Sequence, residues 1–156
     1  MAAKLSAGIL LYRTRAGVGT EVLLAHMGGP LWRNKDQGAW SIPKGEYAEP
    51  EAPLQAALRE FQEELGSAAP AGPFLDLGEA RQPGGKIVRV WAAEGELNTA
   101  TVVSNTFELE WPRGSGNMRQ FPEIDRAEWF TFDAARAKLL KGQLPFLDRL
   151  SVLLGP

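Results

Sequence analysis

Two apolar runs, Leu5–Tyr12 and Glu21–Met27, open the chain and are separated by a polar segment that contains Gly17 and Gly19. Apolar runs of this length that are bounded by turn residues are typical of β-strands, and the short connection favours antiparallel pairing. The segment Gly28–Gly38 is rich in glycine and polar residues and is predicted to be a loop. A short extended piece is expected to follow the loop at Trp40–Ile42.

The period of the apolar residues changes between residues 53 and 65. Apolar side chains recur there at steps of three and four residues: Leu54, Ala57, Leu58, Phe61 and Leu65. This spacing places them on one face of a helix. Pro53 suits the first helical turn, where its missing N–H costs no hydrogen bond, and Gly66 suits the left-handed residue that closes a helix. The sequence therefore predicts a helix over Pro53–Leu65.

Strand-like segments return after this helix. Phe74–Gln82 and Lys86–Ala93 flank Pro83-Gly84-Gly85 and predict a β-hairpin. Asn105–Trp111 is a further strand candidate, and Pro112–Gln120, which contains two glycines and a serine, is predicted to be a flexible loop.

The C-terminal part predicts one more strand and two helices. Arg126–Phe130 is expected to be a short strand, Asp133 to cap a helix that reaches about Lys141, and Pro145–Leu153 to form the last helix. We find no internal repeat and no boundary within residues 1–156. Because helices are separated by strands, we expect a single α/β domain, an α/β/α sandwich with a mixed β-sheet.

Composition and charge exclude several classes of protein. The formal charge of −2 argues against binding to duplex nucleic acid, which draws most of its affinity from excess positive charge. The absence of cysteine excludes disulfides, zinc–thiolate sites and cysteine nucleophiles, and it favours a cytoplasmic location. No apolar stretch approaches the length of about 20 residues that spans a bilayer, so we expect no membrane partner. The expected assembly is a monomer or a homodimer.

Three carboxylates, Glu60, Glu63 and Glu64, fall on one face of the predicted helix, because residues three or four apart are neighbours there. At about 6 Å and an effective dielectric constant near 20, each pair repels by roughly 3 kcal/mol. A divalent cation such as Mg²⁺ reverses this balance by bridging carboxylates and substrate phosphates. Such a string taken alone is more often a solvated helix face, so the surrounding residues decide the interpretation.

The fixed positions around these carboxylates form a longer pattern: Gly45, Glu51, Arg59, Glu60, Phe61, Glu63, Glu64 and Gly66. With its spacing, this pattern resembles the signature of the Nudix hydrolases. Ser67 departs from the signature, which normally closes on an aliphatic residue, and this affects packing at the helix end. The resemblance extends to Trp40–Gly45 ahead of the box and to Glu123–Phe130 near the C-terminus.

The resemblance implies an α/β/α sandwich that catalyses attack of water on a diphosphate linkage with Mg²⁺, for which Mn²⁺ is a substitute. Glu60 and Glu64 resemble the principal metal ligands, Glu63 a third ligand, and the Gly45 carbonyl a further one. Arg59 resembles the partner of Glu51 in an ion pair that orients the helix carboxylates.

The general base stays open at this point, because the family draws it from the box or from a later loop. Glu60 is the candidate within the box, and Glu123 is the candidate outside it, followed by Glu108 and Glu110. A base must lie within hydrogen-bond reach of the attacking water.

Substrate contacts are expected from Lys44 beside the box and from Arg33, Lys35 and Trp32 in the preceding loop. The implied substrate is a nucleoside di-, tri- or polyphosphate. The approach from Trp40 to Gly45 resembles that of family members that cleave dinucleoside polyphosphates or inositol pyrophosphates. Isopentenyl diphosphate isomerase shares the fold, but its chemistry uses a cysteine. The alternative that stays open is a nucleotide-sensing or protein-binding module without turnover.

Overall fold

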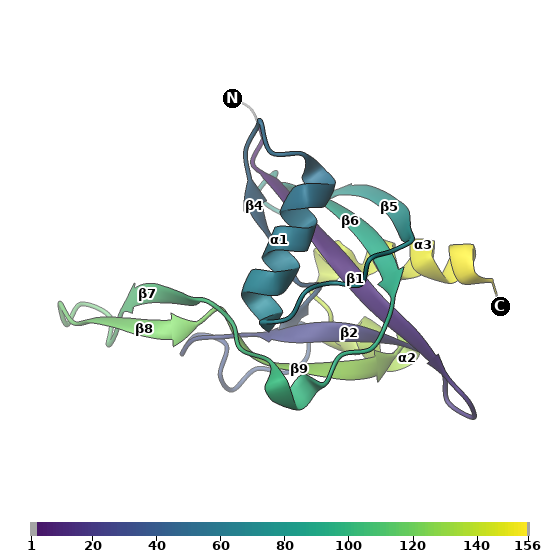
Figure 1. The fold of residues 1–156 in the computed structure, drawn as a ribbon. Helices are drawn as coiled ribbons and strands as arrows, with labels where there is room; N and C mark the ends of the chain where they lie inside the picture. Colours follow the sequence, from purple (N-terminus) through teal and green to yellow (C-terminus); the bar gives the residue numbers. More distant parts are fainter. Residues whose placement is uncertain (1–2, 156) are drawn as a thin grey trace.

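The long first strand organises the structure, a computed structural model that describes residues 3–155 (Figure 1). On one edge, β1 (Leu5–Arg15) pairs in parallel with β6 (Ile87–Glu94). On its other edge, β1 pairs with β4 (Lys44–Tyr47) near its start and with β2 (Gly19–Met27) near its end, both antiparallel. Strands β2 and β4 therefore pair with the same edge of β1, β4 with its first half and β2 with its second half.

The chain crosses between these two halves of the sheet in the segment that precedes α1. Strand β3 (Trp40–Ser41) pairs with the end of β2, and the chain then enters β4 beside the start of β1. Strand β5 (Phe74–Arg81) extends the sheet beyond β6, and β9 (Ile124–Thr131) extends it beyond β2. The result is a seven-stranded mixed sheet that is split where β1 and β2 diverge.

Helices cover both faces of this sheet, because successive residues of β1 point to opposite sides. Ala7, Ile9 and Leu11 belong to one buried cluster with the apolar face of α1 (Pro53–Leu65). The second cluster, on the other face, contains Leu10 and Tyr12 and is covered by α2 (Phe132–Lys138) and α3 (Leu144–Leu154). The predicted sandwich of helix, mixed sheet and helix is confirmed.

A separate two-stranded hairpin projects from the domain beside β9, at the left of Figure 1. It consists of β7 (Thr106–Glu110) and β8 (Met118–Pro122), with Phe107 opposite Phe121 in the register. The prediction of a flexible loop over Pro112–Gln120 is therefore wrong for its last three residues. Those residues, Met118 to Gln120, are polar or exposed, and they become a strand only because β7 supplies a partner.

Three further boundaries differ from the sequence prediction. Residues 44–47 form strand β4, although no strand was expected there. Helix α2 is capped by the Thr131 hydroxyl, which accepts from Ala134 N at 3.3 Å, while Asp133 lies in the first turn. That helix ends at Lys138, and Lys141 begins a separate 3₁₀ turn, Lys141–Gln143. A second 3₁₀ turn is Thr99–Thr101.

The other predicted elements are confirmed, with small shifts at their ends. Helix α1 has the predicted bounds, and Gly66 closes it with a φ of 78°, as expected of a left-handed C-cap. No helix within residues 3–155 combines the length and the apolar character needed to cross a membrane.

Gln143 is a fully buried amide that ties the C-terminal segment to the entry of β4. Its Oε1 accepts from Ile42 N at 2.8 Å, and its Nε2 donates to Ser41 Oγ at 3.0 Å.

Gln143→Leu removes both bonds and leaves the buried Ile42 N–H unpaired, so we expect a loss of roughly 1–3 kcal/mol in the free energy of unfolding. Denaturant unfolding measures this loss. The matched control is Gln55→Leu on the exposed face of α1, and equal stability of the two variants would contradict this role of Gln143.

Candidate active site

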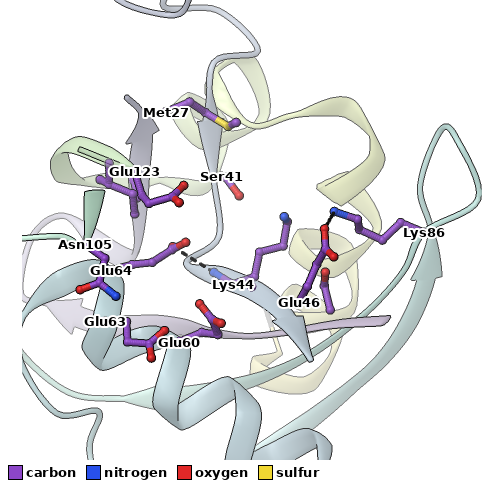
Figure 2. A pocket seen from close by; sticks show the side chains of 14 residues that line it. Met27, Ser41, Lys44, Glu46, Glu60, Glu63, Glu64, Lys86, Asn105 and Glu123 are labelled. Atoms are coloured by element: carbon purple, nitrogen blue, oxygen red, sulfur yellow. Dashed lines mark hydrogen bonds and ion pairs between the residues drawn. The ribbon is translucent and has the colours of Figure 1, made fainter. Parts of the chain in front are cut away.

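A cleft of about 430 Å³ lies where β1 and β2 diverge (Figure 2). One side carries carboxylates from α1 and from the residue before β9, namely Glu60, Glu63, Glu64 and Glu123. The other side carries Lys44, Glu46 and Lys86 from β4 and from the turn before β6. The remaining lining residues are Ser6, Ala25, Met27, Ser41, Gly45, Asn105 and Ile124. The split sheet thus brings acidic and basic side chains to one opening.

Gly45 lies in close contact with a side chain of α1. A Cβ atom at this position would lie 2.0 Å from the carboxyl carbon of Glu60. The backbone of Gly45 does not have a positive φ, so glycine is needed here for space and not for its conformational freedom. Glu60 consequently reaches the cleft across the backbone of β4.

Arg59 fixes the direction of the neighbouring carboxylates. Its Nε and Nη2 donate to the two oxygens of Glu51 at 2.8 and 2.9 Å, which is a bidentate ion pair. Its Nη1 also donates to Glu60 at 2.8 Å and to Glu63 at 3.1 Å. The hydrogen bonds from Arg59 lower the pKa of Glu51 below its usual value. The predicted ion pair between Arg59 and Glu51 is therefore present, and it connects the start of α1 with its acidic face.

The negative charge on the acidic side lies partly out of water. Burial raises the pKa of Glu64 to about 8, although Lys44 N donates to its Oε1 at 3.2 Å. Burial also raises the pKa of Glu60, and the charge of Glu123 opposes ionisation of both residues. Ionised carboxylates in such a place need a compensating cation.

The residues present fit a hard divalent cation, because all of the available donors are oxygens. Glu60 and Glu64 line the cleft together with Gly45, and the Glu60 carboxyl lies directly against the Gly45 backbone. Within residues 3–155, no group of three acidic or histidine side chains is arranged closely enough to hold a metal ion. Two of the carboxylates, Glu60 and Glu63, are instead paired with Arg59.

The structure brings together Lys44, Gly45, Glu60, Glu63, Glu64 and Glu123, six of the residues predicted from the sequence, in the lining of one cleft. Arg59 lies beside them through its contacts with Glu60 and Glu63. Their catalytic, metal-binding and substrate-binding roles stay predictions.

Three predicted substrate contacts lie outside the lining of this cleft. Trp32 lines a neighbouring cavity of about 260 Å³ together with Phe107, and the two cavities share Met27 and Glu123. Lys35 Nζ lies 5.1 Å from the centre of the Trp32 ring. Arg33 is exposed in the same loop. The loop therefore borders the cleft and does not form its floor.

The two further candidates for the general base, Glu108 and Glu110, lie outside the lining of the cleft. Glu110 accepts from Gly114 N at 2.8 Å and from Gly116 N at 3.2 Å, so it stabilises the turn of the β7–β8 hairpin. Glu108 is exposed on the same hairpin and does not line the cleft.

Several lining residues were not predicted from the sequence. Ser6 and Lys86 lie far apart in the chain and meet at the cleft only through the pairing of β1 with β6. Asn105 is positioned by its backbone, since its N–H donates to Glu63 O at 2.9 Å at the end of α1. No local motif marks these residues, and only the sheet register could have identified them.

A family model described as NUDIX domain matches residues 3–150. The chain belongs to the Nudix hydrolase family. This family assignment, with the carboxylates of the box all present, makes the chain a Nudix-type pyrophosphohydrolase.

Solved structures share the Nudix fold at low sequence identity. A C. elegans Ap4A hydrolase in a binary complex is 21% identical, with a TM-score of 0.65, and the match covers 96% of this chain and 97% of that one. The NUDIX domain of Shewanella oneidensis NrtR, complexed with ADP ribose, is 16% identical with a TM-score of 0.67 over 99% and 90% of the two chains. The C-terminal domain of mouse MUTYH, in complex with human PCNA, is 16% identical with a TM-score of 0.62 over 98% and 90%.

The contact between Gly45 and Glu60 predicts a specific double-mutant result. Gly45→Ala forces the Glu60 carboxyl to move, which we expect to cost roughly 1–3 kcal/mol of folding free energy and most of the activity. In a Glu60→Ala background the obstructing carboxyl is absent, so the same Gly45→Ala change should cost little stability. Thermal or denaturant unfolding of the four proteins measures the coupling. Equal costs in both backgrounds would contradict the proposed close contact.

The raised pKa of Glu64 predicts how pH affects the metal-free protein. Below the ordinary glutamate pKa, the residue is protonated in both the folded and the unfolded state. Between that value and about 8 the unfolded state releases the proton that the folded state keeps, so the folded state loses stability as pH rises. We therefore expect the difference in unfolding free energy between Glu64→Gln and the wild type, measured with a chelator present, to change with pH. It should shift by roughly 1–3 kcal/mol in favour of Glu64→Gln when the pH is raised from 5 to 8. A stability difference that is the same at both pH values would contradict the burial of this carboxylate.

Proposed function

We propose that the chain hydrolyses the diphosphate linkage of a nucleoside polyphosphate with Mg²⁺, or with Mn²⁺ as a substitute. The observation that carries this proposal is the cleft in which the partly buried Glu60 and Glu64 face Glu123 and lie beside Lys44. The proposal takes residues 1–156 as one catalytic domain, monomeric or homodimeric. We place it in the cytoplasm, a compartment that suits a chain without cysteine.

The metal would be held by Glu60, Glu64 and the Gly45 carbonyl, with Glu63 as a further ligand. When bound, the cation neutralises phosphate charge and lowers the pKa of a coordinated water. Two observations support this ligand set: the residue pattern of the box and the oxygen donors that line the cleft.

The protein's own residues would orient the substrate and remove a proton. Glu123 is our proposed general base, because it lines the cleft on the same side as the helix carboxylates and would accept a proton from the attacking water. Glu60 is the alternative base. Arg59 acts as a positioning residue, since its bidentate pair with Glu51 holds the acidic face of α1 in place. Lys44 would bind a phosphate oxygen beside the box.

The base of the nucleotide would occupy the neighbouring cavity. Trp32 and Phe107 supply aromatic surface there, and the shared residues Met27 and Glu123 connect that cavity to the catalytic cleft. Lys35 and Arg33 lie in the same loop and would attract the phosphates. This arrangement supports a substrate with its base beside the loop and its phosphates along the carboxylates.

Dinucleoside polyphosphates are the first substrates to test, because one structural neighbour is an Ap4A hydrolase. ADP-ribose is the second, because the NrtR domain was solved with that ligand. The MUTYH domain, which forms a complex with PCNA, keeps open the alternative of a binding module without turnover. The retained carboxylates Glu60, Glu63 and Glu64 favour turnover over this alternative.

Substitution of the box carboxylates tests the proposal. Glu60→Gln and Glu64→Gln remove a charge with little change of shape, and each should lower kcat by roughly 10²–10⁴-fold with Mg²⁺. The measurement is phosphate-product formation from a panel of nucleoside polyphosphates, with ¹⁸O-water to identify the phosphorus that is attacked. Glu94→Gln, on the exposed end of β6, is the matched control.

Wild-type rates in either box variant would contradict the role of that residue. Binding of nucleotides without any turnover across the panel would instead support the module.

A further inference from the structure

The hydroxyl of Ser6 is buried and lacks a hydrogen-bond partner among residues 3–155, although it lines the cleft. Only 1% of Ser6 is exposed. Buried hydroxyl groups in proteins nearly always have a partner, because an unpaired one costs free energy. A hydroxyl in the lining of an open cleft can obtain that partner from a ligand.

The sheet register places two lysines on the same face as Ser6. Ser6 lies opposite Glu46 and Gly8 lies opposite Lys44 in the β1–β4 pairing, so these side chains project to one side. On the other edge of β1, Ser6 lies opposite Val88, and Lys86 is two residues earlier on the same side.

Glycine at position 8 leaves room for the Lys44 side chain. A Cβ atom on Gly8 would lie 2.7 Å from Lys44 Cβ and 2.5 Å from Pro43 O. Lys44 can therefore lie across β1 next to Ser6. The side of the cleft opposite the carboxylates thus holds the ammonium groups of Lys44 and Lys86 (Figure 2), and Ser6 lines the same cleft.

Glu46 holds the second ammonium group at the edge of the cleft. Lys86 Nζ lies 3.0 Å from Glu46 Oε2, and both side chains are substantially exposed. An exposed ion pair of this kind contributes little stability, so it can open in favour of a better anion. A phosphate group with several charged oxygens is such an anion.

We propose that Ser6, Lys44 and Lys86 form a subsite for a substrate phosphate beyond the linkage that is cut. This inference rests on the proposed function, since it orders the phosphates of that substrate along the cleft. The carboxylate side takes the metal and the scissile diphosphate, and the lysine side takes the next phosphate. The enzyme consequently prefers chains of three or more phosphates over substrates with two.

A chain-length series tests this preference. The readout is the ratio of kcat/KM for a dinucleoside tetraphosphate to that for ADP-ribose, which has two phosphates. Lys86→Gln should lower this ratio by about tenfold, the effect of one lost charge-assisted hydrogen bond, and Ser6→Ala by about threefold. Glu46→Gln should raise the ratio, because it removes the carboxylate that competes for Lys86.

Lys4→Gln is the matched control, since Lys4 carries the same charge nearby but does not line the cleft. Its ratio should equal that of the wild type. A ratio that falls equally in Lys4→Gln and Lys86→Gln would overturn the subsite, because general electrostatics would then account for the effect. Unchanged ratios in both Lys86→Gln and Ser6→Ala would overturn it as well.

Binding of inorganic tripolyphosphate separates this inference from the proposed function. Calorimetric titration at a fixed free Mg²⁺ concentration requires no turnover. Weaker binding to Lys86→Gln and Ser6→Ala than to Lys4→Gln would support the subsite even if no nucleotide is hydrolysed. Equal binding to all three variants would overturn the subsite while leaving the hydrolase proposal intact.

Discussion

The structure depends on one constraint: carboxylates that repel one another are held together, partly out of water, on one face of α1. Burial raises the pKa of both Glu60 and Glu64, although Arg59 and Lys44 act in the opposite direction. Glu60 is nevertheless held by close packing against Gly45 and by the guanidinium of Arg59, and Glu64 accepts a hydrogen bond from Lys44 N. In the proposed function a divalent cation would bind at these carboxylates, because it would remove the cost of their partly buried charge.

The divided edge of β1 is the structural reason why this arrangement is accessible to a substrate. Because β2 and β4 occupy different halves of that edge, the sheet opens between them, and the chain from β3 to β4 borders the opening. Helix α1 packs on one face of the sheet, while the side chains of Lys44 and Glu46 project on the other. The opening therefore presents carboxylates and ammonium groups in the lining of one cleft.

Features that depend on local spacing could be predicted from the sequence. The apolar period gave the correct bounds of α1, and the box placed Glu60, Glu64 and Gly45 in one site. Features that depend on pairing between distant segments could not. Ser6 and Lys86 meet only through the parallel register of β1 and β6, which no local pattern encodes. Strands β8 and β4 were missed for the same reason, since their polar residues become strands only when a partner strand is present.

The central claim is that the acidic face of α1 binds a divalent cation against a diphosphate. Titration with Mn²⁺, followed by electron paramagnetic resonance in the presence of a non-hydrolysable nucleoside polyphosphate, tests it most directly. The account predicts saturable Mn²⁺ binding to the wild type, which is weakened about tenfold or more in Glu64→Gln, where one charged ligand is lost. Mn²⁺ affinity that is the same in the wild type and in Glu64→Gln, or the absence of saturable binding to the wild type, would contradict it.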